Sequence, residues 1–171
     1  GGLGTQVSIQ NLFENIPARL KFLKSAAAES TQIKNMFKAL AMAHPQIQFR
    51  LEENGQLLFY FRASSALERV SEVLGVKLYE GHAQRDHIKV TAFFTDPHTV
   101  QKTSKNIWLF AQNRWIQDRG LNVAVIESYR SLLMHGEYPS AAVFIDCDPN
   151  FIDVNIHPTK SQVKFHDPSA V

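Results

Sequence analysis

The sequence is poor in cysteine: Cys147 is its one thiol, so no internal disulfide can form. Such sparing use of cysteine is typical of a protein kept in a reducing compartment. Cys147 ends an apolar run, AAVFIDC. Because free cysteine behaves as a small hydrophobe, we expect a buried structural thiol there and not a nucleophile.

Long hydrophobic runs and an excess of one charge are also missing. No apolar stretch approaches the ~18 residues of a membrane span, and no signal peptide opens the chain, so we expect no membrane partner. The formal net charge of +2 is too small to indicate a nucleic-acid partner without local clustering. The seven histidines have no metal-ligand spacing with one another or with Cys147, and we expect no metal site.

What is present is the composition of a globular protein, with 44% hydrophobic and 20% charged residues. A chain of 171 residues can form one domain with a true core, or at most two small ones. Internal repeats and long linkers are absent. The chain opens on GGLGTQV without an initiator methionine, which suggests a fragment of a longer protein.

Hydrophobic periodicity predicts interspersed helices and strands. Residues 7–13 alternate like a strand, and Pro17 then suits the first turn of a short basic helix. Helical spacing predicts a second helix whose apolar stripe contains Ile33, Met36, Phe37, Leu40 and Ala41. A third helix over 66–74 ends at Gly75, and a fourth, capped by Asp118, extends to Leu132.

Two hairpins are predicted, around Asn54-Gly55 and around Gln112-Asn113. Further strands are expected over 88–94 and 141–146, with residues 151–165 completing the sheet edge. This mixture of hairpins and crossovers predicts an α+β sandwich, with a mixed β-sheet and the helices packed on one face.

The stretch DVNIHPTKSQVKF, residues 153–165, places a cation on a stiff loop between two strand-like segments. Pro158 fixes φ and donates no backbone hydrogen bond, so the strand pattern breaks just before Lys160. Such a loop suits delivery of one positive charge to a phosphate oxygen. Composition alone favours an ordinary solvated loop lysine at position 160, because lysine side chains are mostly exposed.

Two other segments carry basic residues: GTQVSIQNLFENIPARLKFLK (4–24) and LFAQNRWIQDR (109–119). In the first, Arg19, Lys21 and Lys24 suit the solvated face of an amphipathic helix. In the second, Arg119 falls on a helix's first turn, where the dipole disfavours a cation. Anion binding fits that position, although a surface arginine paired with Asp118 or Glu127 is the alternative.

These three segments resemble the MutL family of DNA mismatch repair proteins, over nearly the whole chain. The matching family blocks are GT-x-V…LF-x-N-x-PAR-x-KFL, FVNGR-x-V-x-DR and the final lysine loop. One departure is Gln112-Asn113 where most members have Asn-Gly; Asn113 can keep the turn because asparagine tolerates left-handed angles. The resemblance implies the ribosomal protein S5 domain 2-like fold of the transducer domains of GHKL ATPases. Residues 1–16 would end the ATPase core, and 17–171 would form the transducer.

The resemblance also implies roles for particular residues. Lys160 would contact the γ-phosphate of ATP bound in the neighbouring domain, with Gly4 and Thr5 in the last nucleotide-facing segment of that core. The arginine that matches Arg119 is implicated in DNA binding, and Arg114 is a second candidate. ATP and Mg²⁺ would be cofactors of the parent protein alone, with none bound by this fragment. The implied partners are DNA, the N-terminal GHKL domain, a homodimer partner and MutS, in a bacterial cytoplasm.

No D-x-G-x-G and no GFRGEA-like segment of the family's ATPase core occurs here, and its metal-dependent endonuclease motif is also missing. We therefore expect no enzymatic activity from this chain alone, within a parent that is an ATPase. One alternative is a stand-alone nucleic-acid-binding module of S5-like fold that uses Arg19, Lys21, Arg114 and Arg119. Another is the transducer of a different GHKL protein such as a type II topoisomerase, although the PARLKFLK block resembles MutL specifically.

Overall fold

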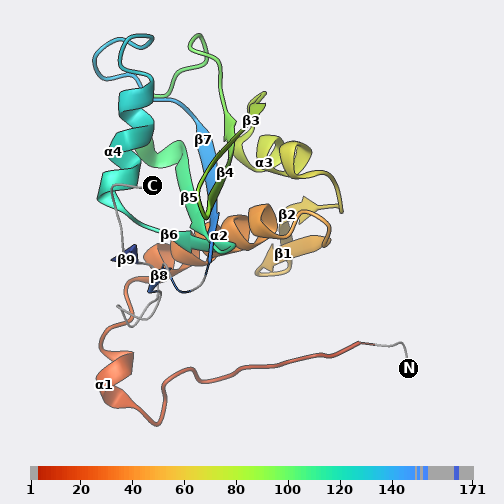
Figure 1. Cartoon of the computed structure of the whole chain (residues 1–171). Helices are drawn as coiled ribbons and strands as arrows, with labels where there is room; N and C mark the ends of the chain where they lie inside the picture. The colour runs from red at the N-terminus through yellow and green to blue at the C-terminus, as the bar shows by residue number, and fades with distance from the viewer. Residues whose placement is uncertain (1–3, 149, 151, 154–163, 166–171) are drawn as a thin grey trace. The chain divides into compact units, whose positions relative to one another are not determined.

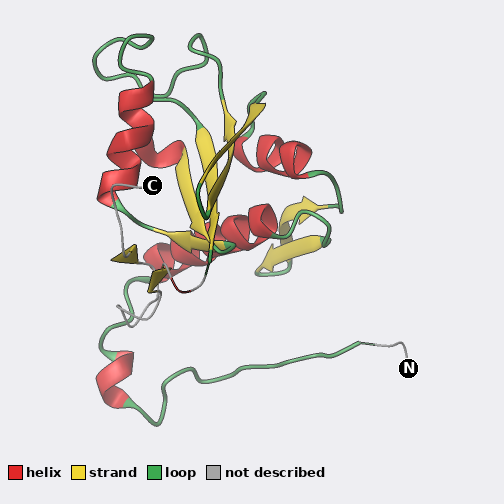
Figure 2. Cartoon of the chain, viewed as in Figure 1, coloured by secondary structure: helices red, strands yellow, loops and turns green. Residues whose placement is uncertain are grey.

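A computed structural model describes residues 4–148, 150, 152–153 and 164–165 (Figure 1). The chain divides into two compact units, Gly1–Asn35 and Met36–Val171. Figure 2 shows that helices and strands are concentrated in the second unit.

The described part of the N-terminal unit contains helix but no strand. Residues 4–10 have no regular secondary structure, and the strand predicted over 7–13 is wrong. Apolar alternation makes a strand only beside a partner edge, and Val7 and Ile9 remain exposed instead. Helix α1 (Pro17–Leu20) begins at proline, as predicted, and α2 (Ala26–Ala43) starts in this unit.

The C-terminal half of α2 packs through small side chains. Ala39, Ala41 and Met42 are buried, whereas the predicted stripe positions Met36 and Leu40 are 50% and 45% exposed. Phe37 and Ala41 of that stripe do pack, so the predicted face was only partly right. Nearly every residue over 36–43 is apolar, and periodicity cannot then identify which side of a helix is buried.

A hairpin and a third helix follow as predicted. Strands β1 (Phe49–Glu53) and β2 (Gln56–Phe61) pair antiparallel around Asn54 and Gly55, whose φ angles of 53° and 77° fit a type I′ turn. Helix α3 (Ala66–Leu74) starts with a capping box between Ser65 and Glu68. It ends at Gly75, which has the left-handed φ of 69° that glycine adopts without steric cost.

The main sheet has five strands in the order β3-β4-β7-β5-β6. These strands are β3 (Tyr79–Arg85), β4 (Ile88–Phe94), β5 (Ile107–Ala111), β6 (Arg114–Ile116) and β7 (Ala141–Cys147). The β5–β7 pair is parallel and the others are antiparallel, so the predicted mixed sheet is confirmed. The 3-10 helix η1 (Ser104–Asn106) leads into β5, and α4 (Arg119–Ser128) follows β6.

Three details of the sheet differ from expectation. Strand β3 was not predicted, because its sequence YEGHAQR has no apolar alternation; it forms by backbone pairing at the sheet edge. Helix α4 ends at Ser128, so Leu132 lies beyond it. The last segment does not extend the main sheet where it is described: β8 (Ile152–Asp153) and β9 (Lys164–Phe165) pair with each other.

Helices cover both faces of the sheet, which corrects the expectation of one covered face (Figure 1). The side that we term the α3 face carries Phe93, Trp108, Phe110 and Ala142, packed against α2 and α3. The opposite side, the α4 face, carries Ile107, Leu109, Val143 and Ile145, packed against α4. The physical reason is that all five residues of β5 are buried, so both of its faces need a cover.

A buried arginine stabilises the α3 face. Arg69 of α3 is fully buried, and its guanidinium donates to the backbone carbonyls of Ala41 (2.7 Å), Pro45 (3.0 Å), Ile47 (2.9 Å) and Arg62 (2.6 Å). Burial lowers the pKa of Arg69, yet a guanidinium stays charged in proteins. Arg69 therefore anchors the end of α2 and the end of β2 to α3.

Candidate functional site

The β5–β6 hairpin forms as predicted, despite its unusual turn residues. Gln112 and Asn113 have φ angles of 52° and 58°, so both adopt the left-handed region. The backbone N–H of Gln112 donates to the Ile145 carbonyl at 3.0 Å, and its side-chain amide donates to the Cys147 carbonyl. These bonds anchor the hairpin to β7 and fix where β6 delivers the chain to α4.

Helix α4 starts with the predicted cap. The Asp118 carboxylate accepts a hydrogen bond from the Leu121 N–H at 2.8 Å, which satisfies one donor of the helix's first turn. Arg119 is the next residue and its side chain is exposed. The sequence thus places a cation, Arg119, at the N-terminal end of α4, where the helix dipole favours an anion.

Arg119 has no carboxylate partner within the described part of the chain. Glu127 instead pairs with Arg130 at 3.2 Å, and the Asp118 carboxylate accepts from the helix backbone. No described salt bridge includes Arg119. The alternative of a surface arginine neutralised by Asp118 or Glu127 therefore does not occur in this structure.

Arg119 lines a cleft of about 630 Å³ between η1, the end of β6 and the start of α4. Ile107, Leu109 and Ile116 form part of its wall, and Lys105 lies on the η1 side. The rim also contains polar side chains: Ser104, Gln117, Asp118 and Asn122. Sequence reasoning missed Lys105, because no local signal indicates that η1 lies beside the start of α4.

Arg114, the second candidate, lies at the start of β6 and is exposed. It pairs with Ala111 and shares the α4 face with Ile116 by strand alternation. Arg114 is not among the residues that line the cleft. The structure therefore places both arginines on the side of the sheet that α4 covers, with Arg119 alone in the cleft.

Lys160 lies outside the described residues, as do Asn155 and His157. The ends of its segment are described: Ile152 pairs with Phe165, and Asp153 with Lys164, both antiparallel. Antiparallel pairing of this kind is what the predicted loop between two strands requires.

Gly4 and Thr5 are exposed and lie in backbone without regular secondary structure. In the same unit, the Arg19 guanidinium lies over the Phe13 ring, 5.8 Å from its centroid. Lys21 follows α1 and is exposed. The N-terminal cations thus belong to one unit, and Arg114 and Arg119 to the other.

Cys147 is buried, as predicted, and desolvation raises the pKa of its thiol. A protonated, buried thiol is a poor nucleophile. Within the described residues, no three His, Cys, Asp or Glu side chains lie together so as to hold a metal ion. No described helix is long and apolar enough to cross a membrane.

A second, apolar cleft of about 590 Å³ lies between α4 and the sheet. Val90, Val143 and Val125 are among its lining residues. Near one end the Tyr129 hydroxyl, whose pKa burial raises, donates to the Thr95 carbonyl at 2.6 Å. The cleft wall offers few polar groups, so its surface suits packing and not catalysis.

Comparisons with known proteins agree with the residue blocks. Residues 70–171 match the family model of the DNA mismatch repair protein, C-terminal domain. The DNA mismatch repair protein MutL of Christiangramia forsetii is 38% identical over 172 residues, which are 98% of this chain and 28% of the relative. MutL of Geobacter sp. strain M21 is 35% identical over 99% of this chain and 27% of its own length. The chain therefore spans 27–28% of these curated relatives.

Solved structures show the same fold. The Aquifex aeolicus MutL ATPase domain complexed with ADP matches with a TM-score of 0.60 and 28% identity, over 81% of this chain and 51% of that one. The α+β, S5 domain 2-like class expected from the sequence is confirmed by such neighbours. In those solved proteins, this fold forms about half of a larger ATPase-domain chain.

Proposed function

The chain belongs to the DNA mismatch repair family that includes MutL, and on this premise we propose that it is the transducer domain of a MutL-type ATPase. In this function the domain carries nucleotide state from a neighbouring GHKL core to a DNA-contacting surface. The solved MutL relative complexed with ADP supports a nucleotide-using parent. ATP and Mg²⁺ would bind to that core, of which Gly4 and Thr5 form the last segment, in a bacterial cytoplasm.

Lys160 supplies the nucleotide contact in this proposal. Its support is the motif DVNIHPTKSQVKF and the β8–β9 pairing that brackets it. A lysine ammonium is a compact charge that can compensate a terminal phosphate during transfer. Because the contact would exist only in the docked, ATP-bound state, it can shift the conformational equilibrium toward that state.

Arg119, with Arg114 in support, supplies the DNA contact. The observation that carries this part is the Arg119 side chain itself: exposed, at the start of α4, in a cleft and without a carboxylate partner in the described chain. A cation held there costs stability of the helix unless an anion arrives. Phosphate contacts of this type fix a protein on DNA without reading its sequence.

The remaining partners of the proposal are a second MutL protomer and MutS. ATP-dependent docking of Lys160 onto the neighbouring core would couple nucleotide state to domain closure, to dimerisation and to the grip on DNA. The parent protein would hydrolyse ATP, whereas this chain alone lacks the core motifs for it.

Substitution Arg119→Ala tests the DNA contact. Loss of one phosphate contact should weaken DNA binding roughly fivefold at moderate salt. The melting temperature should not fall, because the cation that disfavours the helix start is removed. The measurement is a fluorescence anisotropy titration of labelled duplex DNA. The matched control is Arg130→Ala, which removes a charge that Glu127 already neutralises. Equal affinities of wild type, Arg119→Ala and Arg130→Ala would contradict the DNA assignment.

A stand-alone nucleic-acid-binding module remains the second candidate, and the unpaired Arg119 supports it equally. DNA binding by this chain without its parent would be its main property. If the isolated chain binds DNA as tightly as the full-length protein, and nucleotide leaves that affinity unchanged, this second candidate is favoured.

A further inference from the structure

Two cations from separate elements line the cleft at the start of α4. Lys105 comes from η1 and Arg119 from α4, and both side chains are exposed. The β5–β6 hairpin joins these elements and, through its bonds to β7, holds them beside each other. The pair is therefore a product of the fold, because the two positions are separated in the sequence by a whole hairpin.

Two other surface cations of this unit are paired with carboxylates, whereas Lys105 and Arg119 are not. Lys102 pairs with Glu137 at 3.3 Å, and Arg130 pairs with Glu127 at 3.2 Å. Within the described chain, no salt bridge includes Lys105 or Arg119. The cleft is thus lined by two cations that have no salt-bridge partner in the described chain, and by one carboxylate, so its charged lining is net positive and favours an anion.

The other lining groups indicate which anion fits. One carboxylate, Asp118, lines the cleft, and it accepts a hydrogen bond from the Leu121 N–H. Ser104 and Asn122 add a hydroxyl and an amide, which can donate to phosphate oxygens. The apolar wall and the volume of about 630 Å³ leave room for more than a single phosphate. This combination suits a phosphodiester chain, with sugar against the wall and phosphates at the cations.

We propose that Lys105 and Arg119 form a two-cation clamp that grips the phosphodiester backbone of nucleic acid in this cleft. The inference rests on the proposed DNA contact of Arg119 and extends it to a residue that neither the motifs nor the family blocks indicate. Lys105 holds one phosphate from the η1 side, and Arg119 holds another from the α4 side. The clamp therefore contributes two of the charge contacts that determine the salt dependence of binding.

The test is the salt dependence of DNA affinity for matched variants of the full chain. Each lost phosphate contact lowers the slope of log affinity against log salt by about 0.9 on duplex and about 0.7 on single strands. Lys105→Ala and Arg119→Ala should each lower the slope by the amount that corresponds to about one phosphate contact. The double variant should lower it by the amount for about two contacts. Lys105→Arg should retain the wild-type slope, because it keeps the charge.

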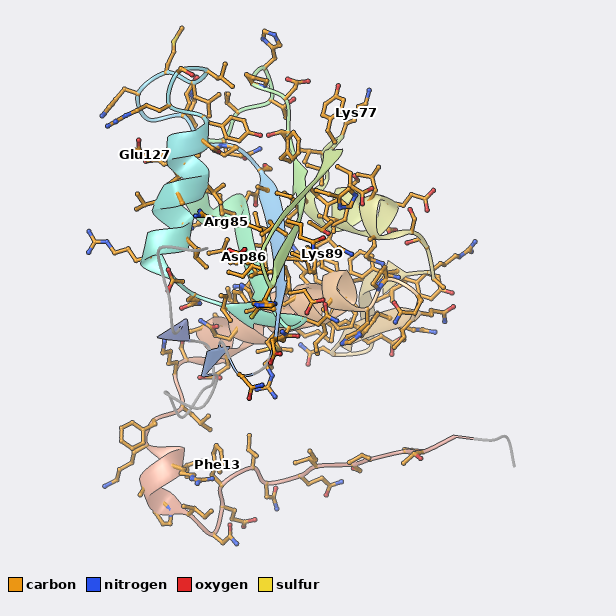
Figure 3. The ribbon with its side chains drawn as sticks, in the orientation of Figure 1. Phe13, Lys77, Arg85, Asp86, Lys89 and Glu127 are labelled. Carbon is orange, nitrogen blue, oxygen red and sulfur yellow. The ribbon has the colours of Figure 1, made fainter. Side chains whose placement is uncertain are left out.

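Lys77→Ala is the control for net charge. Lys77 is exposed and precedes β3, at the sheet edge opposite β6; Figure 3 shows it on the far side of the sheet from α4. Its removal should leave the salt slope unchanged. One outcome would overturn the clamp and leave the DNA contact intact. In it, Lys105→Ala has the same salt slope as Lys77→Ala, and Arg119→Ala alone has a lower slope.

Two further outcomes separate the clamp from its premise. If neither Lys105→Ala nor Arg119→Ala changes the slope, the proposed DNA contact itself fails. A free phosphate could be the true ligand, so inorganic phosphate is titrated at constant ionic strength. Displacement of DNA from the wild type at low phosphate concentration, with no slope change in Lys105→Ala, would show a small-anion site and overturn the clamp.

Discussion

The two faces of the same sheet are packed to different degrees. On the α3 face, Val70 and Phe110 are fully buried, and Phe110 stacks on Phe144 with centroids 4.4 Å apart. On the α4 face, α4 is described in full and contains no buried residue. An apolar cleft of about 590 Å³ remains between that helix and the sheet. One face is a closed core, and the other is an incompletely covered surface.

This difference in packing assigns stability mainly to one face of the sheet and binding to the other. Burial of apolar side chains is the main favourable contribution to folding, so the α3 face holds most of the free energy that maintains the domain. The unpaired cations Arg119 and Lys105 lie at one end of the sparsely packed side. Substitutions on the α3 face should therefore change the free energy of unfolding, and substitutions at the cleft should change affinity.

The largest expected effect is that of Arg69→Met. The substitution removes the donors for the carbonyl of Ala41, in a buried bond, and for those of Pro45 and Ile47, in partly buried bonds. A buried acceptor left unsatisfied costs about 1–3 kcal/mol. The free energy of unfolding in urea should fall by at least about 3 kcal/mol. Arg62→Met, at an exposed position, should change it by less than about 0.5 kcal/mol. Similar losses for the two variants would mean that Arg69 does not anchor the α3 face.

A smaller effect compares one valine on each face. Val70 of α3 is fully buried, whereas Val125 of α4 is partly buried and borders the apolar cleft. Val70→Ala should cost about 2 kcal/mol, because it leaves a new cavity in a closed core. Val125→Ala should cost less than about 1 kcal/mol, because the space beside it is already open. Both positions are helical, so the change in helix propensity is the same for the two variants. Equal losses in the free energy of unfolding would contradict the difference in packing between the two faces.

Local chemistry explains what the sequence could predict. Both hairpins and the caps at Gly75 and Asp118 depend on residues within a few positions, and they formed where those residues indicated. Strand β3 was missed because pairing with β4, and not its own side chains, determines it. The apolar stripe of α2 was only partly right, because nearly every residue over 36–43 is apolar.

In the candidate site, too, local features could be predicted from the sequence and long-range ones could not. Arg119 could be predicted from the block LFAQNRWIQDR and from its cap, both of which are local. Lys105 could not, since its proximity to Arg119 arises from the path of β5 and β6 through the sheet. Long-range pairing of this kind has no signature in a single segment of sequence.

Whether this domain transmits nucleotide state is tested by ATP turnover of the full-length parent that carries Lys160→Ala. Loss of a charge-assisted contact to the γ-phosphate should lower turnover about tenfold or more, with wild-type unfolding and unchanged DNA affinity in the absence of ATP. Lys77→Ala is the matched control and should turn over ATP at the wild-type rate. Wild-type turnover in Lys160→Ala would contradict the transducer assignment.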